Sequence, residues 1–399
     1  MKIAIVGCPF QTTYGHYISS LRTGLQNVTG SSVQWIATNC GCGAPEELAR
    51  QFQVNDCDYF EMRTRIGNLG FIGYTPGMLK QGIKLPIRYV SNHWRAARYA
   101  ELASGADVMH FQQTLNSYGA DVVYHLLKRQ MKPALVITLH ELDPEQIAIP
   151  SHNRYYNRAD AIIVHDRLIK EKLASLGVSA DLINVVRAGT NLAEGEEAAR
   201  DGIVFYGGHH LKKSKGIDIL LQAYGILKGR LQKLPRLRIH GHYGTTPPDI
   251  REMARQIGVD GDIDWLDDLP GGGSPAEMVR LYRRSQVCVL PYRGSYAGLP
   301  VGVAASNRLP IIGTKNGGIP DLIGDLAIYV DENDAGELAN RIEQILGDEA
   351  MQRDHGARLR AYAETHLCWD AVASDTLKVY QSAIERAARG RKAKQMATA

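Results

Sequence analysis

The sequence predicts an α/β fold with two Rossmann-like domains, each a doubly wound parallel sheet, and three observations lead to this prediction. The chain has 399 residues, which exceeds one ordinary core and suits two domains of roughly 180–200 residues each. Short apolar runs alternate with helical patterns in two successive series. A polar, glycine-containing segment separates the two series. Such alternation is typical of a parallel sheet covered by helices on both faces.

The first series contains short apolar runs that we expect to be strands. Several are apolar on both faces, as strands buried inside a parallel sheet must be. Their ranges are Lys2–Val6, Val33–Ala37, Asp107–Phe111, Ala134–Leu139, Asp160–Val164 and Ile183–Val186. Between the third and fourth runs, Val122 and Leu126 recur at helical spacing and predict a helix over Ser117–Met131.

The segment Gly189–Gly202 interrupts the alternation. It is polar and acidic and contains three glycines, which is typical of a linker. The strands expected after it are Gly202–Tyr206, Arg236–His240, Ile263–Leu266, Gln286–Leu290, Pro310–Gly313 and Ala327–Val330. Apolar stripes predict helices over Ile217–Leu227 and Trp369–Ile384. Asp334 and Glu337 resemble a capping box at the start of a further helix.

These patterns place the domain boundaries. We expect a first domain over residues 1–190, a linker over 191–201, a second domain over 202–366, a closing helix over 367–388 and a basic flexible tail over 389–399. The two sheets should face each other across a cleft. Because ligands of doubly wound sheets bind outside the carboxyl ends of the strands, we expect the functional site between the domains.

Composition and charge favour a soluble globular protein. Hydrophobic residues make up 44% of the chain and charged residues 22%. No run approaches the ~20 apolar residues of a membrane helix, and the apolar N-terminal run is too short for a signal peptide, so a cytoplasmic location is expected. The net charge of +4 does not favour nucleic acid as a partner. The basic tail is expected to be solvated, with weak peripheral attraction to anionic lipid at the inner membrane face as the alternative. A homo-oligomer is left open.

The sequence shows no pattern typical of a metal site. Cys40-Gly41-Cys42 lacks the two-residue spacer of most zinc sites, so reduced thiols are favoured over a metal cluster. Asp260, Asp262 and Asp264 alternate but lack the glycine and distal glutamate of a calcium loop. We interpret them as a turn that leads into a strand. Neither a metal nor another cofactor is expected.

The stretch from Val287 to Asp321 predicts a strand, a glycine loop and a helix, followed by the same sequence of elements again. Gly298 lets the backbone pass close to a ligand, and Pro300 suits a first helical turn. A second helix start follows Gly317 and Gly318. Two helix N-termini at one sheet edge could hold a diphosphate through their free amides. The alternative is a pair of ordinary helix–strand connections.

This stretch resembles the donor-binding signature of the family 4 retaining glycosyltransferases, which have the GT-B fold. The residues in register are Pro291, Gly298, Leu299, Pro300, Ala304, Pro310, Gly317, Gly318 and Pro320. Lys215-Gly216-Ile217-Asp218 is similar to a second element of the family, and Arg238–Gly241 to the strand after it. Trp369 and Tyr380 match the closing helix, so the resemblance covers nearly the whole chain.

The resemblance implies metal-independent transfer of a sugar from a nucleotide diphosphate sugar to an acceptor hydroxyl, with retention of anomeric configuration. The donor is a co-substrate, and the acceptor is a glycan, a lipid-linked molecule or a small molecule, in glycan, glycoconjugate or natural-product biosynthesis. His140 and Lys215 are the implied catalytic residues: His140 orients the donor sugar and Lys215 binds the diphosphate. The implied donor-binding residues are Gly15, Lys212, Ser295, Gly298, Leu299, Pro300, Gly317 and Gly318.

The chain also departs from the family pattern. Ser295 and Val303 occupy the positions of two family glutamates, one beside the donor sugar and one on the nucleotide ribose. The family arginine that works with the lysine is absent, with Gly208 near its place. These departures motivate a second hypothesis, a non-catalytic GT-B partner subunit of an active glycosyltransferase. An epimerase or phosphorylase on the same fold is a third, since fold does not fix reaction.

Overall fold

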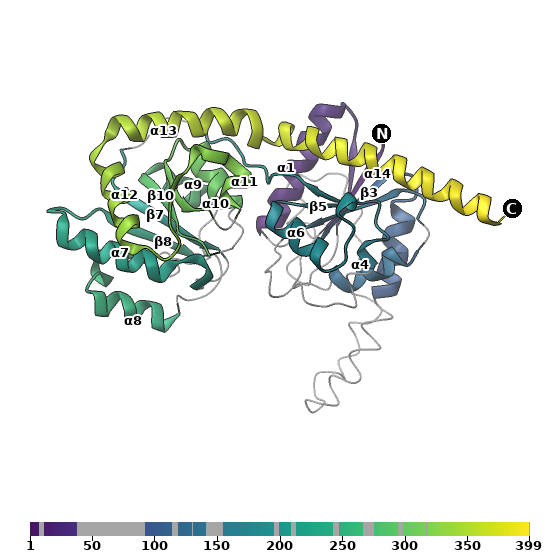
Figure 1. The fold of residues 1–399 in the computed structure, drawn as a ribbon. Helices are drawn as coiled ribbons and strands as arrows, with labels where there is room; N and C mark the ends of the chain where they lie inside the picture. Colours follow the sequence, from purple (N-terminus) through teal and green to yellow (C-terminus); the bar gives the residue numbers. More distant parts are fainter. Residues whose placement is uncertain are drawn as a thin grey trace, which may run out of the picture. The chain divides into compact units, whose positions relative to one another are not determined.

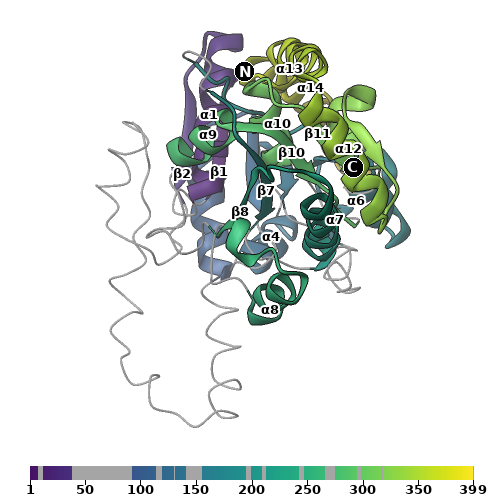
Figure 2. The same ribbon diagram turned by 90° about the vertical axis from the view of Figure 1, so that its left-hand side faces the viewer.

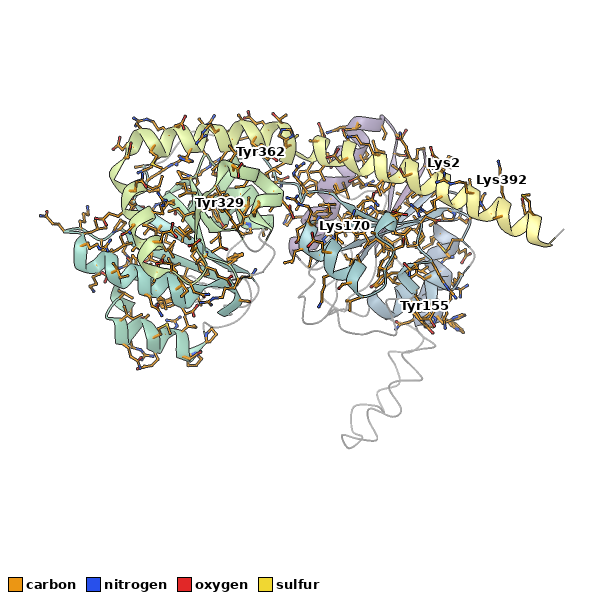
Figure 3. All side chains as sticks on the ribbon, viewed as in Figure 1. Lys2, Tyr155, Lys170, Tyr329, Tyr362 and Lys392 are labelled. Atoms are coloured by element: carbon orange, nitrogen blue, oxygen red, sulfur yellow. The ribbon has the colours of Figure 1, made fainter. Side chains whose placement is uncertain are left out.

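The computed structural model describes residues 1–7, 12–37, 92–113, 119–129, 131–140, 155–194, 199–208, 213–241, 247–265, 275–293, 298–315 and 318–398. The chain forms two compact units (Figure 1). The first consists of Met1–Val186 with Trp369–Ala399, and the second of Arg187–Cys368. The boundary between the units falls after Val186, whereas we predicted the end of the first domain at residue 190. Side chains fill the layers between each sheet and its helices (Figure 3).

The first unit contains a six-stranded, entirely parallel sheet in the order β2-β1-β3-β4-β5-β6. Its strands are β1 (Ile3–Gly7), β2 (Val33–Ala37), β3 (Val108–Gln113), β4 (Ala134–Leu139), β5 (Ala161–Val164) and β6 (Ile183–Val185). The connecting helices include α1 (Thr12–Thr29), α4 (Gly119–Leu127), α6 (Arg167–Ser175) and the short η2 (Ala180–Leu182). Residues 92–102, which precede β3, are also helical. The apolar runs therefore predicted each of these strands correctly.

Each face of this sheet has its own apolar core. Ile5 and Val136 belong to the core that includes residues of α1 and of the last helix, α14 (Trp369–Thr398). Met109 and Ile137 belong to the core that includes residues of α4 and α6. Because successive residues of a strand point to opposite faces, the doubly apolar runs supply both layers.

The second unit contains another six-stranded parallel sheet, in the order β12-β11-β10-β7-β8-β9. Its strands are β7 (Gly202–Gly208), β8 (Arg236–Gly241), β9 (Ile263–Trp265), β10 (Ser285–Leu290), β11 (Ile311–Thr314) and β12 (Ile328–Val330). Numbered from the first strand of the unit, this is the Rossmann order, which reverses between β7 and β10. Ligands of such sheets bind outside the carboxyl ends at this reversal.

Helices cover both faces of the second sheet, and α7 and α12 pack side by side (Figures 1 and 2). The helical elements are η3 (Lys213–Lys215), α7 (Ile217–Arg230), α8 (Pro248–Ile257), η4 (Asp260–Asp262), α9 (Pro275–Arg283), α10 (Gly298–Ser306), α11 (Ile319–Ile323), η6 (Gly324–Leu326), α12 (Ala335–Gly347), α13 (Glu349–Tyr362) and the π-helical turn η7 (Ala363–Leu367). The helix start expected at Asp334 is confirmed, because Asp334 is the N-cap and its Oδ1 accepts from the amide of Glu337 at 2.8 Å. The reciprocal bond of a capping box is not formed, because Glu337 Oε2 accepts at 2.7 Å from the amide of Asp331 and not from that of Asp334.

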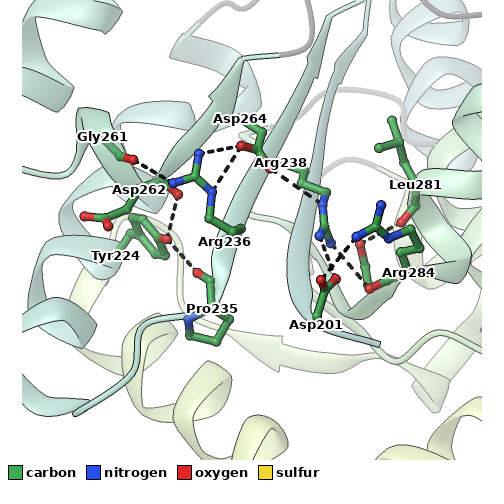
Figure 4. Close-up of polar contacts among 11 residues, drawn as sticks. Asp201, Tyr224, Pro235, Arg236, Arg238, Gly261, Asp262, Asp264, Leu281 and Arg284 are labelled. Carbon is green, nitrogen blue, oxygen red and sulfur yellow. Dashed lines mark hydrogen bonds and ion pairs between the residues drawn. The ribbon is translucent and has the colours of Figure 1, made fainter. Parts of the chain in front are cut away.

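A charged network lies at the amino ends of the strands in the second unit (Figure 4). The buried Arg238 donates to Asp201 Oδ1 at 2.6 Å, and Arg284 also donates to Asp201, at 3.3 Å. A Cβ at Gly202 would lie 2.4 Å from Arg238 Nη1, so this glycine leaves room for the arginine to cross β7. The network therefore joins neighbouring strands at the edge opposite the expected ligand site.

The aspartates that alternate near β9 form a turn into a strand, as predicted. Asp260–Asp262 is η4, and β9 follows directly. Asp264 forms an ion pair with Arg236 (Figure 4). Asp262 forms an ion pair with Lys228 at 2.7 Å. Both carboxylates therefore have cationic side chains as partners.

The prediction of a flexible tail over residues 389–399 is wrong for residues 389–398, because α14 continues through them. Alanine, arginine and lysine have high helix propensity, so a helix that is already packed extends readily into such a sequence. Arg386 donates to the carbonyl of Asp181 at 3.0 Å and Arg391 to that of Lys132 at 3.1 Å. Lys392 points away from the unit (Figure 3), and attraction of this helix to anionic lipid stays a prediction. Among the helices that the structure describes, none is long and apolar enough to cross a membrane.

Candidate functional site

A row of polar side chains lies near the carboxyl edge of the first sheet. Gln112 of β3 pairs in register with Thr138 of β4, and Thr138 pairs with Ile163 of β5. Because side chains alternate between faces, His110, Gln112, Thr138, His140 and His165 share one face. All five are buried. This is the face whose apolar core includes α1 and α14 residues.

His140 is held between two strands. Its Nε2 lies 2.6 Å from Gln112 Oε1, and its Nδ1 lies 3.2 Å from His165 Nε2. His165 Nδ1 lies 2.9 Å from the carbonyl oxygen of Val186. The ring of Tyr17 meets that of His140 edge to face, with 4.7 Å between centroids. His140 is therefore fixed both by hydrogen bonds and by packing.

His110 joins the same row to the last helix. Its Nε2 lies 2.6 Å from Thr138 Oγ1, and its Nδ1 lies 2.6 Å from the hydroxyl of Tyr380 in α14. The side-chain nitrogen of Gln112 lies 3.1 Å from His110 Nε2. A continuous set of polar contacts thus runs from α14 through β3 to His140.

Burial keeps these imidazoles neutral. It lowers the pKa of His165 to about 4 and, with the nearby His165, lowers that of His110 to about 3. Burial, followed by the charges of His165 and His110, also holds the pKa of His140 well below its ordinary value. A neutral imidazole donates one hydrogen bond and accepts one. Within the described residues no group of three His, Cys, Asp or Glu is arranged to hold a metal ion.

The sequence reasoning selected His140 but missed Gln112, His165 and Tyr17 as its partners. A signal was present, because polar residues occur at two-residue spacing near the carboxyl ends of strands that are otherwise apolar. Gly15, one of the implied donor-binding residues, lies inside α1, which begins at Thr12. Its role in donor binding stays a prediction.

In the second unit, Lys215 lies just before α7, on the segment that follows β7. Its Nζ lies 4.3 Å from the centroid of the Tyr292 ring. Gly216 has φ +68°, and a Cβ there would lie 1.9 Å from the carbonyl oxygen of Pro291. Only glycine therefore permits the turn to pack this closely against the segment after β10. The pairing of β7 with β10 places Lys215 beside the reversal of strand order.

Arg293 clamps the same turn. Its backbone amide donates to the carbonyl of Ser214 at 2.8 Å. Its guanidinium donates to both carboxylate oxygens of Asp218, at 2.8 and 3.0 Å, and also to Asn333. The side chains of Arg293 and Asp218 are 21% and 16% exposed, so the pair is partly shielded from water. Sequence reasoning missed this clamp.

The predicted helix starts follow β10 and β11, which are neighbouring strands. Gly298, Leu299 and Pro300 form the first turn of α10, and Gly298 and Pro300 are buried. Gly318 precedes α11 with φ +78°. Both helices therefore begin at the carboxyl edge of this sheet. Lys212, Ser295 and Gly317 lie outside the described residues.

Val303, which the resemblance aligns with the family's ribose-binding glutamate, lies within α10. It is 5% exposed and belongs to the apolar core of the second unit. Its side chain offers no hydrogen bond. A nucleotide at this sheet would therefore need a different contact for its ribose hydroxyls.

Known protein families match both units. Residues 200–348 match "Glycosyl transferases group 1", and residues 36–194 match "Glycosyltransferase Family 4". The chain thus belongs to the family 4, group 1 glycosyltransferases, and its two parallel sheets with flanking helices are the GT-B fold.

Individual relatives agree with this placement. The chain is 28% identical over 180 residues to the D-inositol 3-phosphate glycosyltransferase of Corynebacterium glutamicum, covering 44% of this chain and 42% of that one. It is 26% identical over 253 residues to the enzyme of the same name from Corynebacterium efficiens, covering 57% of each. The chain thus spans about half the length of the curated relatives it matches.

Solved structures show the same fold over nearly the whole chain. Anabaena HepE in complex with UDP and glucose superposes with a TM-score of 0.68 at 15% identity, covering 96% of this chain and 100% of that one. Sucrose-phosphate synthase from Thermosynechococcus elongatus superposes with a TM-score of 0.66 at 20% identity, covering 96% and 98%. At these identities the similarity shows the fold alone.

Proposed function

We propose that the protein transfers a glycosyl group from a nucleotide diphosphate sugar to an acceptor hydroxyl, with retention at the anomeric carbon. The observation that carries this proposal is the position of Lys215, beside the strand reversal of a Rossmann-ordered sheet and held there by Gly216 and Arg293. A cation in this place suits a diphosphate leaving group. Family membership supports the same reaction.

In this reaction the bond between the anomeric carbon and the diphosphate oxygen breaks, and the acceptor oxygen bonds to that carbon on the same face. Negative charge develops on the departing phosphate oxygen. The Lys215 ammonium would stabilise that charge more strongly in the transition state than in the bound donor, which is the requirement for catalysis. The departing phosphate takes the proton of the acceptor hydroxyl, so no protein base is required.

His140 would contact the donor sugar in this proposal. A buried neutral imidazole provides one donor and one acceptor for sugar hydroxyls. We propose no metal or other cofactor, because the lysine supplies the positive charge. Transfer should therefore persist in excess EDTA.

The acceptor is a molecule with a free hydroxyl. The relatives from Corynebacterium are named for D-inositol 3-phosphate, which makes this compound a sensible first acceptor to test beside simple sugars and lipid-linked sugars. Because the matched families and these relatives are all named as transferases, we do not favour a non-catalytic partner subunit.

The test of Lys215 compares two matched variants. Lys215→Ala should lower the transfer rate by at least tenfold, because loss of a charge-assisted contact to the leaving group costs ~2–4 kcal/mol in the transition state. Lys233→Ala removes the same charge from the exposed loop between α7 and β8 and should change the rate less than twofold. A Lys215→Ala protein that is folded and retains activity within threefold of wild type contradicts the assigned role.

A further inference from the structure

We propose that His165 is a positioning residue that holds His140 as its Nδ1–H tautomer, so that Nε2 of His140 is a hydrogen-bond acceptor for a hydroxyl of the donor sugar. The tautomer assignment follows from contacts within the first unit. Only the identity of the sugar as the ligand rests on the proposed function.

The assignment begins at a fixed backbone carbonyl. The amide of Val186 donates to the carbonyl of Val164 at 2.9 Å, which extends the pairing of β5 with β6 and fixes the Val186 peptide. The carbonyl oxygen of Val186 lies 2.9 Å from His165 Nδ1. Because a carbonyl oxygen can only accept, the proton of His165 lies on Nδ1.

The position of the proton on His140 follows from that on His165. His165 is 5% exposed, so a neutral ring is favoured and its Nε2 carries a lone pair. His140 Nδ1 lies 3.2 Å from this nitrogen and must donate to it. A neutral His140 with its proton on Nδ1 has its own lone pair on Nε2.

Gln112 completes the chain of contacts. Its side-chain amide lies 2.6 Å from His140 Nε2, with Oε1 at the contact. The three contacts from Val186 to Gln112 need three donors, and two neutral imidazoles provide two. The third is the Gln112 NH2 group after a half-turn of the amide, which exchanges its oxygen and nitrogen. The half-turn brings Oε1 to the place 3.1 Å from His110 Nε2, which then carries the proton of that ring and donates to it. The alternative is an extra proton shared by the two rings, and burial opposes such a charge.

Packing explains why a separate residue is needed to set the tautomer. The ring of Tyr17 contacts both His140 and His165, with centroids 4.7 and 5.6 Å away, and restricts their orientation. A ring contact does not distinguish Nδ1–H from Nε2–H. The hydrogen bond to His165 does, because one tautomer can donate to it and the other cannot.

A consequence follows for donor recognition. With Nε2 as an acceptor, His140 can bind a sugar hydroxyl that donates, in place of the Gln112 NH2 group. Replacement of that hydroxyl by fluorine, which accepts but cannot donate, should remove the contact. Donor sugars that lack a hydroxyl at this position are therefore expected to be poor substrates.

The experiment is ¹⁵N NMR of the imidazole nitrogens in histidine-labelled full-length protein at pH 7.5, with His140 assigned through a His140→Gln variant. In the wild type, His140 Nδ1 should give the shift of a protonated nitrogen and Nε2 that of an unprotonated one. In His165→Leu the pattern should reverse, because Nε2–H can then donate to Gln112 Oε1. In His165→Gln it should stay as in the wild type, since an amide offers both a donor and an acceptor.

A wild-type His140 protonated on Nε2 or on both nitrogens overturns the proposal, and so does a His165→Leu variant that keeps the wild-type pattern. If the His165→Leu variant fails to fold, the spectra of the wild type and of His165→Gln still decide whether His140 carries its proton on Nδ1. In transfer assays His165→Leu should lower kcat by about tenfold or more, and His165→Gln should largely restore it. Because the NMR result needs no turnover, absence of transfer activity would count against the proposed function alone.

Discussion

The guanidinium of Arg293 and the carboxylate of Asp218 hold the turn that carries Lys215. They form a bidentate pair between the end of β10 and the first turn of α7, directly beside Lys215. Lys215 itself has a flexible stem, so its usefulness to a diphosphate depends on the rigidity of the turn that carries it.

Arg293→Ala should therefore weaken donor binding as well as folding. We expect a loss of about 1–3 kcal/mol in the free energy of unfolding, because the partly buried carboxylate of Asp218 loses two charge-assisted bonds. Urea unfolding gives the loss, and a double-mutant cycle with Asp218→Asn gives the coupling between the pair. The exposed pair Arg353–Glu349, at 71% and 83% exposure, is the control and should show coupling below about 0.5 kcal/mol. Equal coupling in the two pairs would contradict the role of the clamp.

Gly216 offers a test of the same turn at the level of the backbone. Gly216→Ala introduces a Cβ 1.9 Å from the carbonyl oxygen of Pro291, in addition to the strain of φ +68°. Gly258→Ala at φ +81° meets no atom within 4 Å, so it isolates the strain alone, which is of order 1–3 kcal/mol. Thermal unfolding should show the Gly216 variant to be clearly less stable than the Gly258 variant. Similar losses would mean that the turn is free to move away from Pro291.

Among the elements, α14 belongs to the first unit although it comes last in the chain. It packs against α1, and its Tyr380 hydroxyl reaches His110 inside the sheet. A Cβ at Gly24 of α1 would lie 2.5 Å from the carbonyl oxygen of Trp369, which shows how closely the two helices approach. The helix therefore closes the layer that carries the polar row.

Tyr380→Phe should destabilise the first unit by about 1–3 kcal/mol, because it removes the hydroxyl that lies 2.6 Å from the buried Nδ1 of His110. Tyr362→Phe in α13 provides the control, since that ring contacts His366 at 4.5 Å between centroids without burying its hydroxyl in the sheet. Denaturant unfolding of both variants checks the difference. Equal stabilities would show that the Tyr380 hydroxyl is dispensable.

The strands were predictable because burial on both faces demands continuous apolar runs, as in Ile3–Gly7 and Ala134–Leu139. The helical end of α14 was not predictable, because a basic sequence suits both a solvated tail and an exposed helical surface. Only the contacts of Arg386 with Asp181 and of Arg391 with Lys132 distinguish a packed helix from a tail. The expected cleft between the sheets stays a prediction.

The site was only partly predictable for a related reason. His140 and Lys215 were selected through a resemblance that fixes single positions. Gln112 and His165 become neighbours of His140 through strand register, and Arg293 meets an aspartate 75 residues earlier in the chain. Such partners depend on tertiary structure, which local patterns in the sequence do not contain.

For the molecule as a whole, the three buried histidines of the polar row, His110, His140 and His165, predict sensitivity to acid. Their pKa values in the folded state are lowered, to about 4 for His165 and about 3 for His110, whereas the unfolded chain titrates near pH 6.5. Between these pKa values the unfolded state binds more protons than the folded state. The free energy of unfolding is therefore fully retained above pH 6.5. Below that pH it falls by up to ~1.4 kcal/mol per pH unit for each histidine.

Urea unfolding between pH 7.5 and 5 measures this dependence. In a Trp265→Phe background the remaining tryptophans all belong to the first unit, so their fluorescence reports that unit. His165→Gln should flatten the dependence, because one titrating group is removed. A pH dependence that is identical in both proteins would contradict the assignment of neutral buried rings.

The central claim is glycosyl transfer from a nucleotide diphosphate sugar, and a direct assay with the wild-type protein tests it most sharply. The protein is incubated with a panel of ¹³C-labelled nucleotide sugars and with acceptors that include D-inositol 3-phosphate, in excess EDTA, and products are followed by NMR. We predict one donor that yields a glycoside with the anomeric configuration of the donor and an equal amount of nucleoside diphosphate. A product of inverted configuration would contradict the retaining mechanism, and no transfer from any donor to any acceptor would contradict the proposed function.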